Sequence, residues 1–520
     1  MLKELKKLSE IKPPPPPRTN PTQNHNNTEH SNTETTHHIN SHSNRHRQTD
    51  TKDDRISLYA DDNATIITKT EHVRKVKEIT RRYGKATGGA LNEDKTTLIR
   101  IGKMRKQEMT NAQLGAEFRI MQEEERECYL GDVVGAEVTE EERYGEILMK
   151  IEKTGQQWNR EGIGIYGQAL VANTILLGKI THRASVNTIS TAMRKKLKEK
   201  FRSFIWKGED RRAKVRWEVL VKKEEEGGIG LRDPLCAIDA AKMRICVNLM
   251  TKDRQPWMKW IERKLRRVAK NWGVAEAMAA RPTKKQLNGL KEDCVVESSL
   301  RIWFEIGGGG RGRTKEERTD KGETTTVELS GLGVTDTNEK WIPIEGLTGR
   351  QTYDRLIQTR MKIKDYEPRR AHKTIQKIQK QMTADERNYW WRLTHRTIQT
   401  KKRQSKWKKT EDGEFVKSTC PVCKEEEEDW EHYDYECKWM QEMNKKVAAR
   451  VERDQPFSKE EWRLEEEKMS EREMLMVAKA RWIYHCERCK IDMKQRKRID
   501  TTVLMNRLTR RMKIAMQKVK

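Results

Sequence analysis

Two groups of residues in this 520-residue chain have the types and spacing that hold metal ions. Near the beginning, Asp61 and Asp62 stand together between two short apolar runs, in the segment RISLYADDNATII that covers 55–67. The apolar residues on both sides are typical of the two strands of a tight β-hairpin. Two adjacent carboxylates at such a turn can hold a divalent cation such as Mg²⁺, although acidic side chains in turns are also common without one.

The second group lies much later in the chain and combines three cysteines with one histidine. Its spacing is C-x2-C-x8-H-x4-C, formed by Cys420, Cys423, His432 and Cys437. Three thiolates and an imidazole can complete a tetrahedral Zn²⁺ site, and a C-x-x-C pair suits a turn that directs both sulfurs at one ion. We therefore predict a structural zinc ion here. The alternative is a set of unlinked thiols in a helical segment.

The remaining cysteines do not repeat this pattern. Cys486 and Cys489 follow His485, but they lie in 474–493, which reads as one continuous helix, and no second pair of ligands follows them. We interpret them as thiols on a helix. The scattered use of nine cysteines indicates a reducing compartment, where metal sites are more common than disulfides.

The composition indicates a basic, helix-rich protein. Charged residues make up 36% of the chain and hydrophobic residues 34%, so we expect helices with narrow apolar stripes instead of one large core. The net charge of +28 favours a polyanionic partner, with nucleic acid ahead of an anionic membrane surface. The chain shows neither an apolar signal segment nor an apolar run that could span a membrane. We expect an intracellular protein, nuclear or cytoplasmic, that is not secreted.

Basic residues gather just before the cysteine group, whereas the loop of the group itself, 425–431, is strongly acidic and would repel phosphate. We interpret the zinc ion as a staple that presents an adjacent basic arm to RNA or DNA, with a tryptophan that can stack on a base. The arm comprises Arg396, Lys401, Lys402, Arg403, Lys406, Trp407, Lys408 and Lys409. A basic helical stripe after 490 would bind nucleic acid, a membrane surface or a partner, in that order of preference.

Changes in composition and periodicity divide the chain into six segments. The first is poor in apolar residues and contains a polyproline run and scattered histidines, which we interpret as disordered low-complexity sequence. The second shows hairpin, helix, strand and hairpin patterns, with a helical stripe over 71–86 that ends at two glycines. The segments are 1–54 (disordered), 55–137 (mixed α and β), 138–305 (helical), 306–326 (flexible linker), 327–450 (helical, with the cysteine group) and 451–520 (basic and helical).

Five segments, in order, resemble the reverse transcriptases of non-LTR (LINE-type) retrotransposons. The first two are 58–62 (LYADD), similar to the Y/F-A-D-D box, and 88–96 (GGALNEDKT), similar to G-x-x-L-N-x-x-K-T. The third is 127–131 (ECYLG), similar to the primer-gripping hairpin, and the fourth is 204–208 (FIWKG), similar to F-I-W-x-G of the thumb. The fifth is 217–233, which ends EGGIGLRD and is similar to a W-x-x-L…K-x-x-G-G-x-G-L-x-D block. In addition, about 340–440 resembles the zinc-binding region of the same family.

The resemblance implies an α+β fold that is mostly α, with a partial reverse-transcriptase palm, a helical thumb, the linker and a helical zinc-binding region. It implies an RNA-directed DNA polymerase that extends a DNA primer on an RNA template. Asp61 would then be a main ligand of Mg²⁺ and Asp62 an auxiliary ligand, with Lys95 close to the incoming nucleotide. By the same resemblance, the primer-binding residues are Tyr129, Leu130 and Gly131.

Nucleotidyl transfer of this kind uses two metal ions, whose oxygen ligands must come from separate strands. In the family a third carboxylate lies on an earlier strand, but only low-complexity sequence precedes Arg55. We therefore expect a truncated reverse transcriptase that lacks the full catalytic machinery. The alternatives are a non-catalytic RNA- or DNA-binding protein that uses basic helices and a zinc staple, and a relic whose gene model joins unrelated exons.

Overall fold

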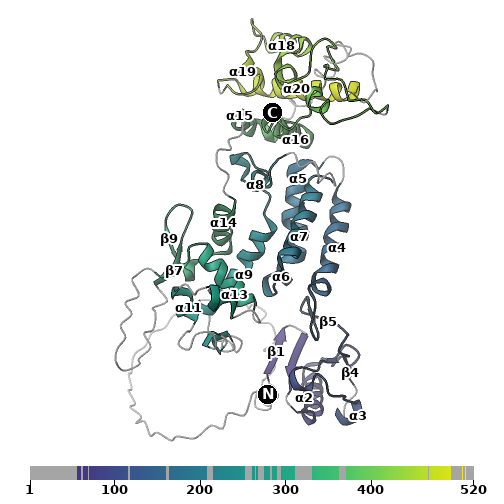
Figure 1. The fold of residues 1–520 in the computed structure, drawn as a ribbon, viewed down its shortest axis with the longest axis vertical. Helices are drawn as coiled ribbons and strands as arrows, with labels where there is room; N and C mark the ends of the chain where they lie inside the picture. Colours follow the sequence, from purple (N-terminus) through teal and green to yellow (C-terminus); the bar gives the residue numbers. More distant parts are fainter. Residues whose placement is uncertain are drawn as a thin grey trace, which may run out of the picture. The chain divides into compact units, whose positions relative to one another are not determined.

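The computed structural model describes residues 55–492 apart from 60–61, 68, 115–117, 160–162, 208–214, 252–260, 264, 267–273, 281–283, 290–293, 311–330, 362–369, 411 and 467, together with 506 and 510. The described chain is mostly helical with a few short strands, which confirms the predicted α+β, mostly α class (Figure 1). It divides into two compact units, Met1–Thr139 and Glu140–Lys520. The division lies two residues after the predicted boundary at 137/138. The segment predicted to be disordered, 1–54, lies outside the described residues.

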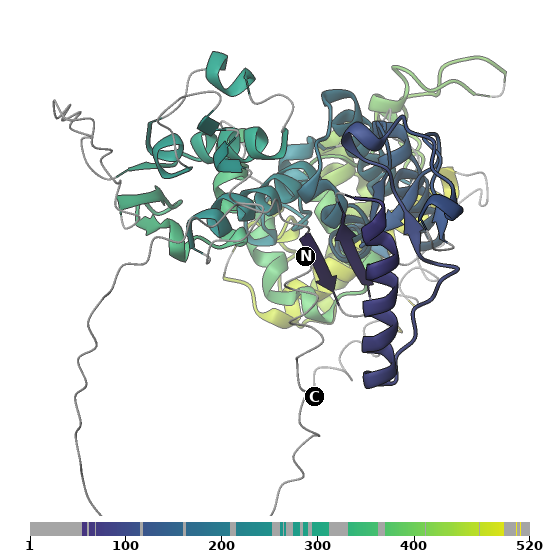
Figure 2. The same cartoon turned by 90° about the horizontal axis from the view of Figure 1, so that it is seen from below.

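The first unit begins with a β-hairpin and a long helix (Figure 2). The elements are β1 (Arg55–Tyr59), β2 (Asp62–Ile66) and α2 (Glu71–Thr87). The two strands pair antiparallel with Tyr59 opposite Asp62, and α2 ends at Gly88, whose φ of 76° suits glycine. The predicted hairpin and the predicted helix over 71–86 are confirmed. Val73 of the helix is buried in a small core with Leu114, whereas Tyr83 of the predicted stripe is exposed.

The rest of the first unit consists of short elements: β3 (Thr97–Leu98), η1 (Gly102–Met104), α3 (Asn111–Leu114), β4 (Arg119–Ile120), β5 (Glu127–Tyr129) and β6 (Asp132–Val134). β3 pairs parallel with β4, so the strand predicted between the helix and the second hairpin is present, although it is only two residues long. β5 and β6 form the predicted second hairpin. Its turn residues, Leu130 and Gly131, have φ of 48° and 80°. Positive φ at both positions is the type I′ geometry, which matches the twist of the flanking strands.

The second unit begins with a bundle of helices that lie side by side (Figure 1). They are α4 (Glu140–Trp158), α5 (Gly164–Val171), the π-helix η2 (Ala172–Leu176), α6 (Leu177–Val186), α7 (Thr191–Ile205), α8 (Trp217–Val221), the 3-10 turn η4 (Glu224–Glu226) and α9 (Pro234–Thr251). Their shared core contains Ile147, Leu176 and Phe201. Asp239 of α9 accepts from Arg194 of α7 at 3.0 Å, which fixes these two helices to each other. The helical character predicted for 138–305 is confirmed in the described residues of that range.

A second cluster contains α11 (Val274–Ala280), α12 (Lys284–Asn288), α13 (Cys294–Glu305), β7 (Gly309–Gly310), β8 (Leu332–Thr335), β9 (Trp341–Pro343), η7 (Ile344–Gly346) and α14 (Gly349–Arg360). β7, β8 and β9 form an antiparallel sheet in that order. The beginning of the predicted linker 306–326 is therefore structured, because Ile306 is fully buried and Gly309–Gly310 pairs with β8. Residues 311–326 of that linker lie outside the described residues.

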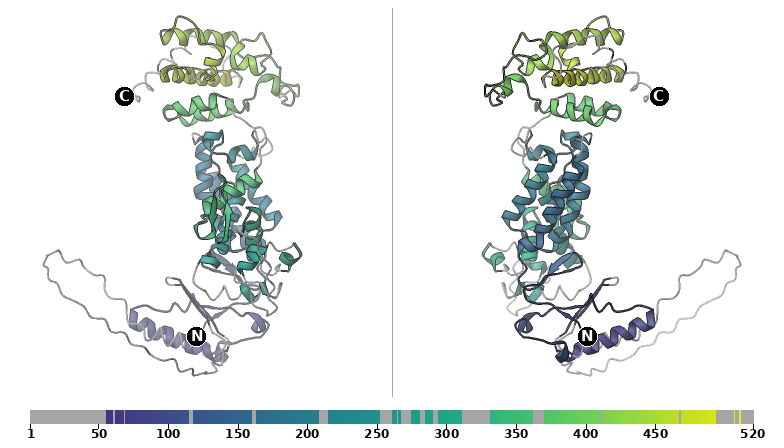
Figure 3. Two further views of the ribbon diagram at one scale, coloured as in Figure 1. Left: turned by 90° about the vertical axis from the view of Figure 1, so that its left-hand side faces the viewer. Right: turned by 90° about the vertical axis from the view of Figure 1, so that its right-hand side faces the viewer.

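The carboxy-terminal module, 371–492, contains α15 (Ala371–Ile378), η8 (Gln379–Gln381), α16 (Ala384–Thr394), α17 (Lys401–Gln404), the π-helix η9 (His432–Glu436), α18 (Lys438–Arg450), α19 (Lys459–Trp462) and α20 (Glu471–Asp492). α20 lies between α18 and the pair α15 and α16 (Figure 3). One core includes Trp390, Met440 and Trp462, so the predicted boundary at 450/451 crosses a continuous core. Capping boxes begin α16 at Thr383 and α19 at Ser458.

No helix in the described ranges is both long and apolar enough to cross a bilayer.

Candidate metal centre

The first two predicted ligands lie on a tight turn of a short hairpin. Thr419 forms an antiparallel bridge with Glu427, and Cys420 N donates to Glu426 O at 2.8 Å. Lys424 N then donates to Cys420 O at 3.0 Å, which closes the turn around the cysteine pair. Lys424 has a φ of 60°, a left-handed conformation that directs the chain back after the second cysteine. The turn thereby buries both cysteine side chains on the same side.

The other two ligands are brought together by the π-helix η9. Cys437 N donates to His432 O at 3.0 Å, which is the bond between residues five apart that defines a π-turn. In a regular α-helix, residues five apart point about 140° away from each other. The wider π-turn places His432 and Cys437 on one side, although four residues separate them in the sequence. The C-x8-H-x4-C part of the spacing therefore fits this unusual helix.

The four side chains converge as a compact donor set. Their ligand atoms all lie within 4.8 Å of one another, and all four residues are buried. Cys420 Sγ lies 4.0 Å from Cys437 Sγ, and Cys423 Sγ lies 3.4 Å from His432 Nε2. A tetrahedral zinc ion with ordinary bond lengths requires about 3.8 Å between two sulfurs and about 3.5 Å between sulfur and nitrogen. The donor set therefore fits a metal ion of this size and coordination.

Two neighbours orient the donor atoms. Glu426 Oε2 lies 2.9 Å from His432 Nδ1, which places the proton on Nδ1 and leaves the Nε2 lone pair for a metal. Tyr484 Oη donates to Cys437 Sγ at 3.3 Å. A hydrogen bond from the Cys420 thiol, helped by the one from Tyr484, lowers the pKa of Cys437 to about 5. The same hydrogen bond raises the pKa of Cys420, so the pair shares one thiolate, the form that binds metal. The ligand spacing alone does not indicate Glu426 or Tyr484, because neither is one of the four ligands.

Buried ion pairs attach the ligand-bearing segment to α20. Asp434, inside η9, pairs with Arg481 of α20, and its other oxygen lies 2.7 Å from Arg463 Nε. Glu428 pairs with Arg488 of α20 and also accepts from the backbone N of Lys401 at 2.7 Å. Both carboxylates are almost fully buried. A buried charge without its partner is strongly destabilising, so these pairs fix how the metal segment lies on α20.

The second cysteine pair belongs to α20, which confirms the predicted helix. Cys489 Sγ lies 3.7 Å from His485 Nε2, and His485 Nδ1 lies 2.8 Å from Tyr433 Oη. Desolvation lowers the pKa of His485 well below its usual range, so the ring stays neutral in this core. Among the described residues, only the Cys420 group has three or more histidines, cysteines or carboxylates close enough to share an ion.

The predicted basic arm divides into two parts. Lys401 is buried, and Lys402 pairs with Glu427 at 3.0 Å and with Asp429 at 3.6 Å. The acidic loop is therefore not simply a repulsive surface beside the arm, because it binds one of the arm's own lysines. Exposed side chains remain at Arg396, Arg403, Lys406, Trp407, Lys408 and Lys409.

The residues assigned to polymerase chemistry all lie in the first unit. Asp61 and the side chain of Asp62 are outside the described residues, although the backbone of Asp62 begins β2. Lys95 is exposed in a turn, where its backbone N donates to Asn92 Oδ1 at 3.1 Å. The predicted primer-binding residues form the β5–β6 turn described above: Tyr129, Leu130 and Gly131. The structure thus places Lys95, Leu130 and Gly131 in turns, and it describes no metal-ligand group among the described residues of the first unit.

The segment 217–233, which resembles a family block, forms a loop whose motif residues hold it closed. Trp217 Nε1 donates to Asp233 Oδ2 at 2.7 Å, so the first and last residues of the block close the loop. Asn173, on the π-helix η2, donates to Gly230 O at 2.8 Å and accepts from Arg232 N at 2.7 Å. A Cβ at Gly228 would lie 1.9 Å from Lys222 O, so only glycine fits there.

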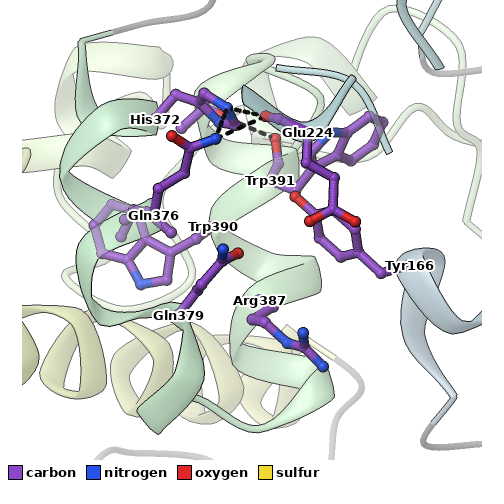
Figure 4. Close-up of a pocket in the computed structure, with 10 residues that line it drawn as sticks. Tyr166, Glu224, His372, Gln376, Gln379, Arg387, Trp390 and Trp391 are labelled. Atoms are coloured by element: carbon purple, nitrogen blue, oxygen red, sulfur yellow. Dashed lines mark hydrogen bonds between the residues drawn. The ribbon is translucent and has the colours of Figure 1, made fainter. Parts of the chain in front are cut away.

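The carboxy-terminal module contacts the same loop, and polar side chains from both line a pocket between them (Figure 4). His372 and Gln376 of α15 contact Glu224 O at 2.5 Å and 2.9 Å. Trp391 Nε1 of α16 and His395 Nε2 lie 3.1 Å and 2.8 Å from Gly227 O. Burial lowers the pKa of His372, and it lowers the pKa of His395 to about 4. Both rings are therefore neutral near pH 7 and donate from Nε2 to a carbonyl.

No protein-family model matches the chain, and no curated protein matches it.

Proposed function

We propose that this chain is a reverse-transcriptase-related protein whose carboxy-terminal module binds RNA or DNA and is held together by a structural zinc ion. The observation that carries the proposal is the tetrahedral spacing of the buried Cys420, Cys423, His432 and Cys437. The set supplies four protein ligands, which is typical of a closed, structural site. The five motifs that resemble LINE-type reverse transcriptases support the descent.

The proposed nucleic-acid surface is the basic arm, which is held in place by contacts with the hairpin that carries the cysteine pair. Glu428 accepts from Lys401 N, and Lys402 pairs with the acidic loop, so the beginning of the arm is attached to the metal hairpin. The exposed basic side chains then extend from a rigid base. They are Arg396, Arg403, Lys406, Lys408 and Lys409. Exposed cations on an ordered segment bind phosphate and release counterions, which makes the affinity dependent on salt.

The test combines metal analysis with salt-dependent binding. The purified chain should contain one zinc ion, and a His432→Ala variant should contain none. For binding, Lys406→Gln with Lys409→Gln is compared with Lys402→Gln, whose charge is already paired with Glu427. The double variant should reduce the slope of log affinity against log salt by about 1.4 on a single-stranded RNA. Equal slopes for both variants, or a zinc-free protein, would refute the proposal.

A second candidate function is RNA-directed DNA synthesis. The antiparallel pairing of β1 and β2, with Tyr59 opposite Asp62, supports it because this is the hairpin that the Y-A-D-D resemblance requires. Asp61 and Asp62 would hold Mg²⁺, Lys95 would lie near the nucleotide, and the β5–β6 turn would hold the primer. The test is extension of a DNA primer on an RNA template with Mg²⁺. Product equal to that of an Asp61→Ala, Asp62→Ala control would remove this activity.

A further inference from the structure

Residues 406–417, directly before the cysteine pair, contain a short β-hairpin that the sequence patterns did not predict. Lys409 and Phe415 form an antiparallel bridge, and Val416 N donates to Lys408 O at 2.9 Å. Thr410 N donates to Glu414 O at 2.6 Å, which extends the same register. Trp407 precedes this ladder in the turn that follows α17, where its backbone N donates to Gln404 O at 3.1 Å. We call the described residues of this range the 406–417 hairpin.

One face of the 406–417 hairpin carries an aromatic side chain together with two cationic ones. Because successive side chains of a strand point to opposite faces, Lys409 shares a face with Phe415 and Lys417, whereas Glu414 belongs to the other face. Trp407 is 45% exposed and Phe415 is 56% exposed. The Nζ atom of Lys409 lies 5.3 Å from the centroid of the Phe415 ring, so aromatic and charged groups are interleaved.

The carboxylates of the next loop do not neutralise this face. Glu427 and Asp429 pair with Lys402, and Glu425 pairs with Lys438. Within the part of the chain that the structure describes, neither Lys409 nor Lys417 forms an ion pair with a carboxylate. The face, together with the exposed Trp407 that precedes it in the chain, therefore offers two cations and two aromatic rings to a partner that is both anionic and flat.

We propose that this face binds single-stranded nucleic acid, with unpaired bases stacked on Phe415 and Trp407 and with phosphates bound by Lys409 and Lys417. The inference rests on the nucleic-acid binding proposed above and specifies its form. Bases of a single strand can leave their stack and lie on an aromatic ring, whereas the bases of a duplex are already stacked on each other. A duplex therefore contacts only the lysines of this face.

The experiment measures the affinity of the full chain for two labelled probes by fluorescence anisotropy: oligo(U) of about 20 nucleotides, which exceeds typical single-strand site sizes, and a duplex of the same length. Phe415→Ala should weaken oligo(U) binding by about tenfold, because stacking on one aromatic ring contributes at that level. Phe415→Tyr keeps a ring and should bind like the parent. Glu414→Gln, on the opposite face, is the matched control for the fold of the hairpin.

The lysines are tested separately from the ring. Lys409→Gln with Lys417→Gln should reduce the salt slope for oligo(U) by about 1.4, whereas Phe415→Ala should leave that slope unchanged. Equal losses of oligo(U) and duplex binding in Phe415→Ala, or a Phe415→Tyr variant as weak as Phe415→Ala, would overturn the inference while leaving nucleic-acid binding in place. Binding of neither probe by the parent chain would refute the proposed function as well. Displacement of oligo(U) from the parent by a poly-glutamate peptide at equal concentration would assign the face to acidic peptides instead.

Discussion

The carboxy-terminal module and the first unit each contain a predicted metal-binding group, but the two groups differ in how far apart in the sequence their ligands must lie. All four candidate metal ligands come from one segment, 420–437, where a hairpin turn and a π-helix suffice to bring them together. The Asp61-Asp62 pair belongs to a single hairpin, whereas the two-metal site that the resemblance implies needs oxygen ligands from separate strands. A local site can be assigned from its spacing, whereas a site made from distant strands requires the whole fold around it.

The two regions also differ in how their polar groups are supported. Around the candidate metal ligands, Glu426, Tyr484 and the buried pairs of Asp434 and Glu428 form a second layer of contacts. In the first unit, the described ion pairs, such as Arg105 with Glu137, lie on partly exposed side chains. Exposed pairs contribute little to stability, whereas buried ones are sensitive to the loss of one partner. This contrast predicts which substitutions have the largest effects.

The largest effect is expected from removing a zinc ligand. Cys437→Ser should abolish zinc binding and unfold the carboxy-terminal module, because structural zinc contributes on the order of 10 kcal/mol, which is as large as the stability of a typical domain. Zinc content and the fluorescence of the buried Trp390 and Trp462 report the outcome. Cys489→Ser, on α20, is the matched control and should keep both. A Cys437→Ser protein with unchanged fluorescence would show that the metal does not hold this core together.

A smaller effect is expected at the buried pair that attaches η9 to α20. Arg481→Met removes one of the two arginines that pair with the fully buried Asp434, the other being Arg463, and should reduce the free energy of unfolding by about 3–5 kcal/mol. Urea unfolding of the zinc-loaded protein measures the change. Adding Asp434→Leu should restore part of the loss, because the buried carboxylate that lost this partner is then gone. No recovery in the double variant would mean that the arginine acts mainly through packing.

Much of this architecture could be predicted from the sequence, and the failures have physical causes. Periodicity and turn residues predicted α2, both hairpins of the first unit and α20, because each depends on neighbours in the chain. The cysteine spacing predicted the buried group of possible metal ligands for the same reason. The burial of Phe457 and Ile306, which lie near the predicted boundaries at 450/451 and 306, depends on packing with other segments and is not visible in the local pattern. The pairing of Lys402 with Glu427 is not visible either, because the two residues are 25 positions apart.

A pH effect is expected at the contact between α15–α16 and the loop 217–233. Burial lowers the pKa of His395 from 6.5 to about 4 in the folded state, so the unfolded state binds more protons in this interval. Stability is therefore complete above about pH 6.5 and falls as the pH decreases towards 4, by up to about 3 kcal/mol. His395→Gln keeps a donor for Gly227 O but does not titrate. Urea unfolding at pH 7.5 and pH 5 should show a smaller difference for this variant than for the parent, and equal differences would contradict the assignment.

The smallest effect is expected in the first unit, at the strained turn between β5 and β6. Leu130 has a φ of 48°, which a side chain with a Cβ adopts at a cost of about 1–2 kcal/mol. Leu130→Gly should relieve this strain and slow the hydrogen exchange of backbone amides in 127–134, by less than tenfold because glycine also loses more conformational freedom on folding. If the Leu130 side chain also holds a primer, the same variant should bind a primer–template more weakly although its hairpin is more stable. A more stable hairpin with unchanged primer–template affinity would show that the strained leucine is not a primer contact.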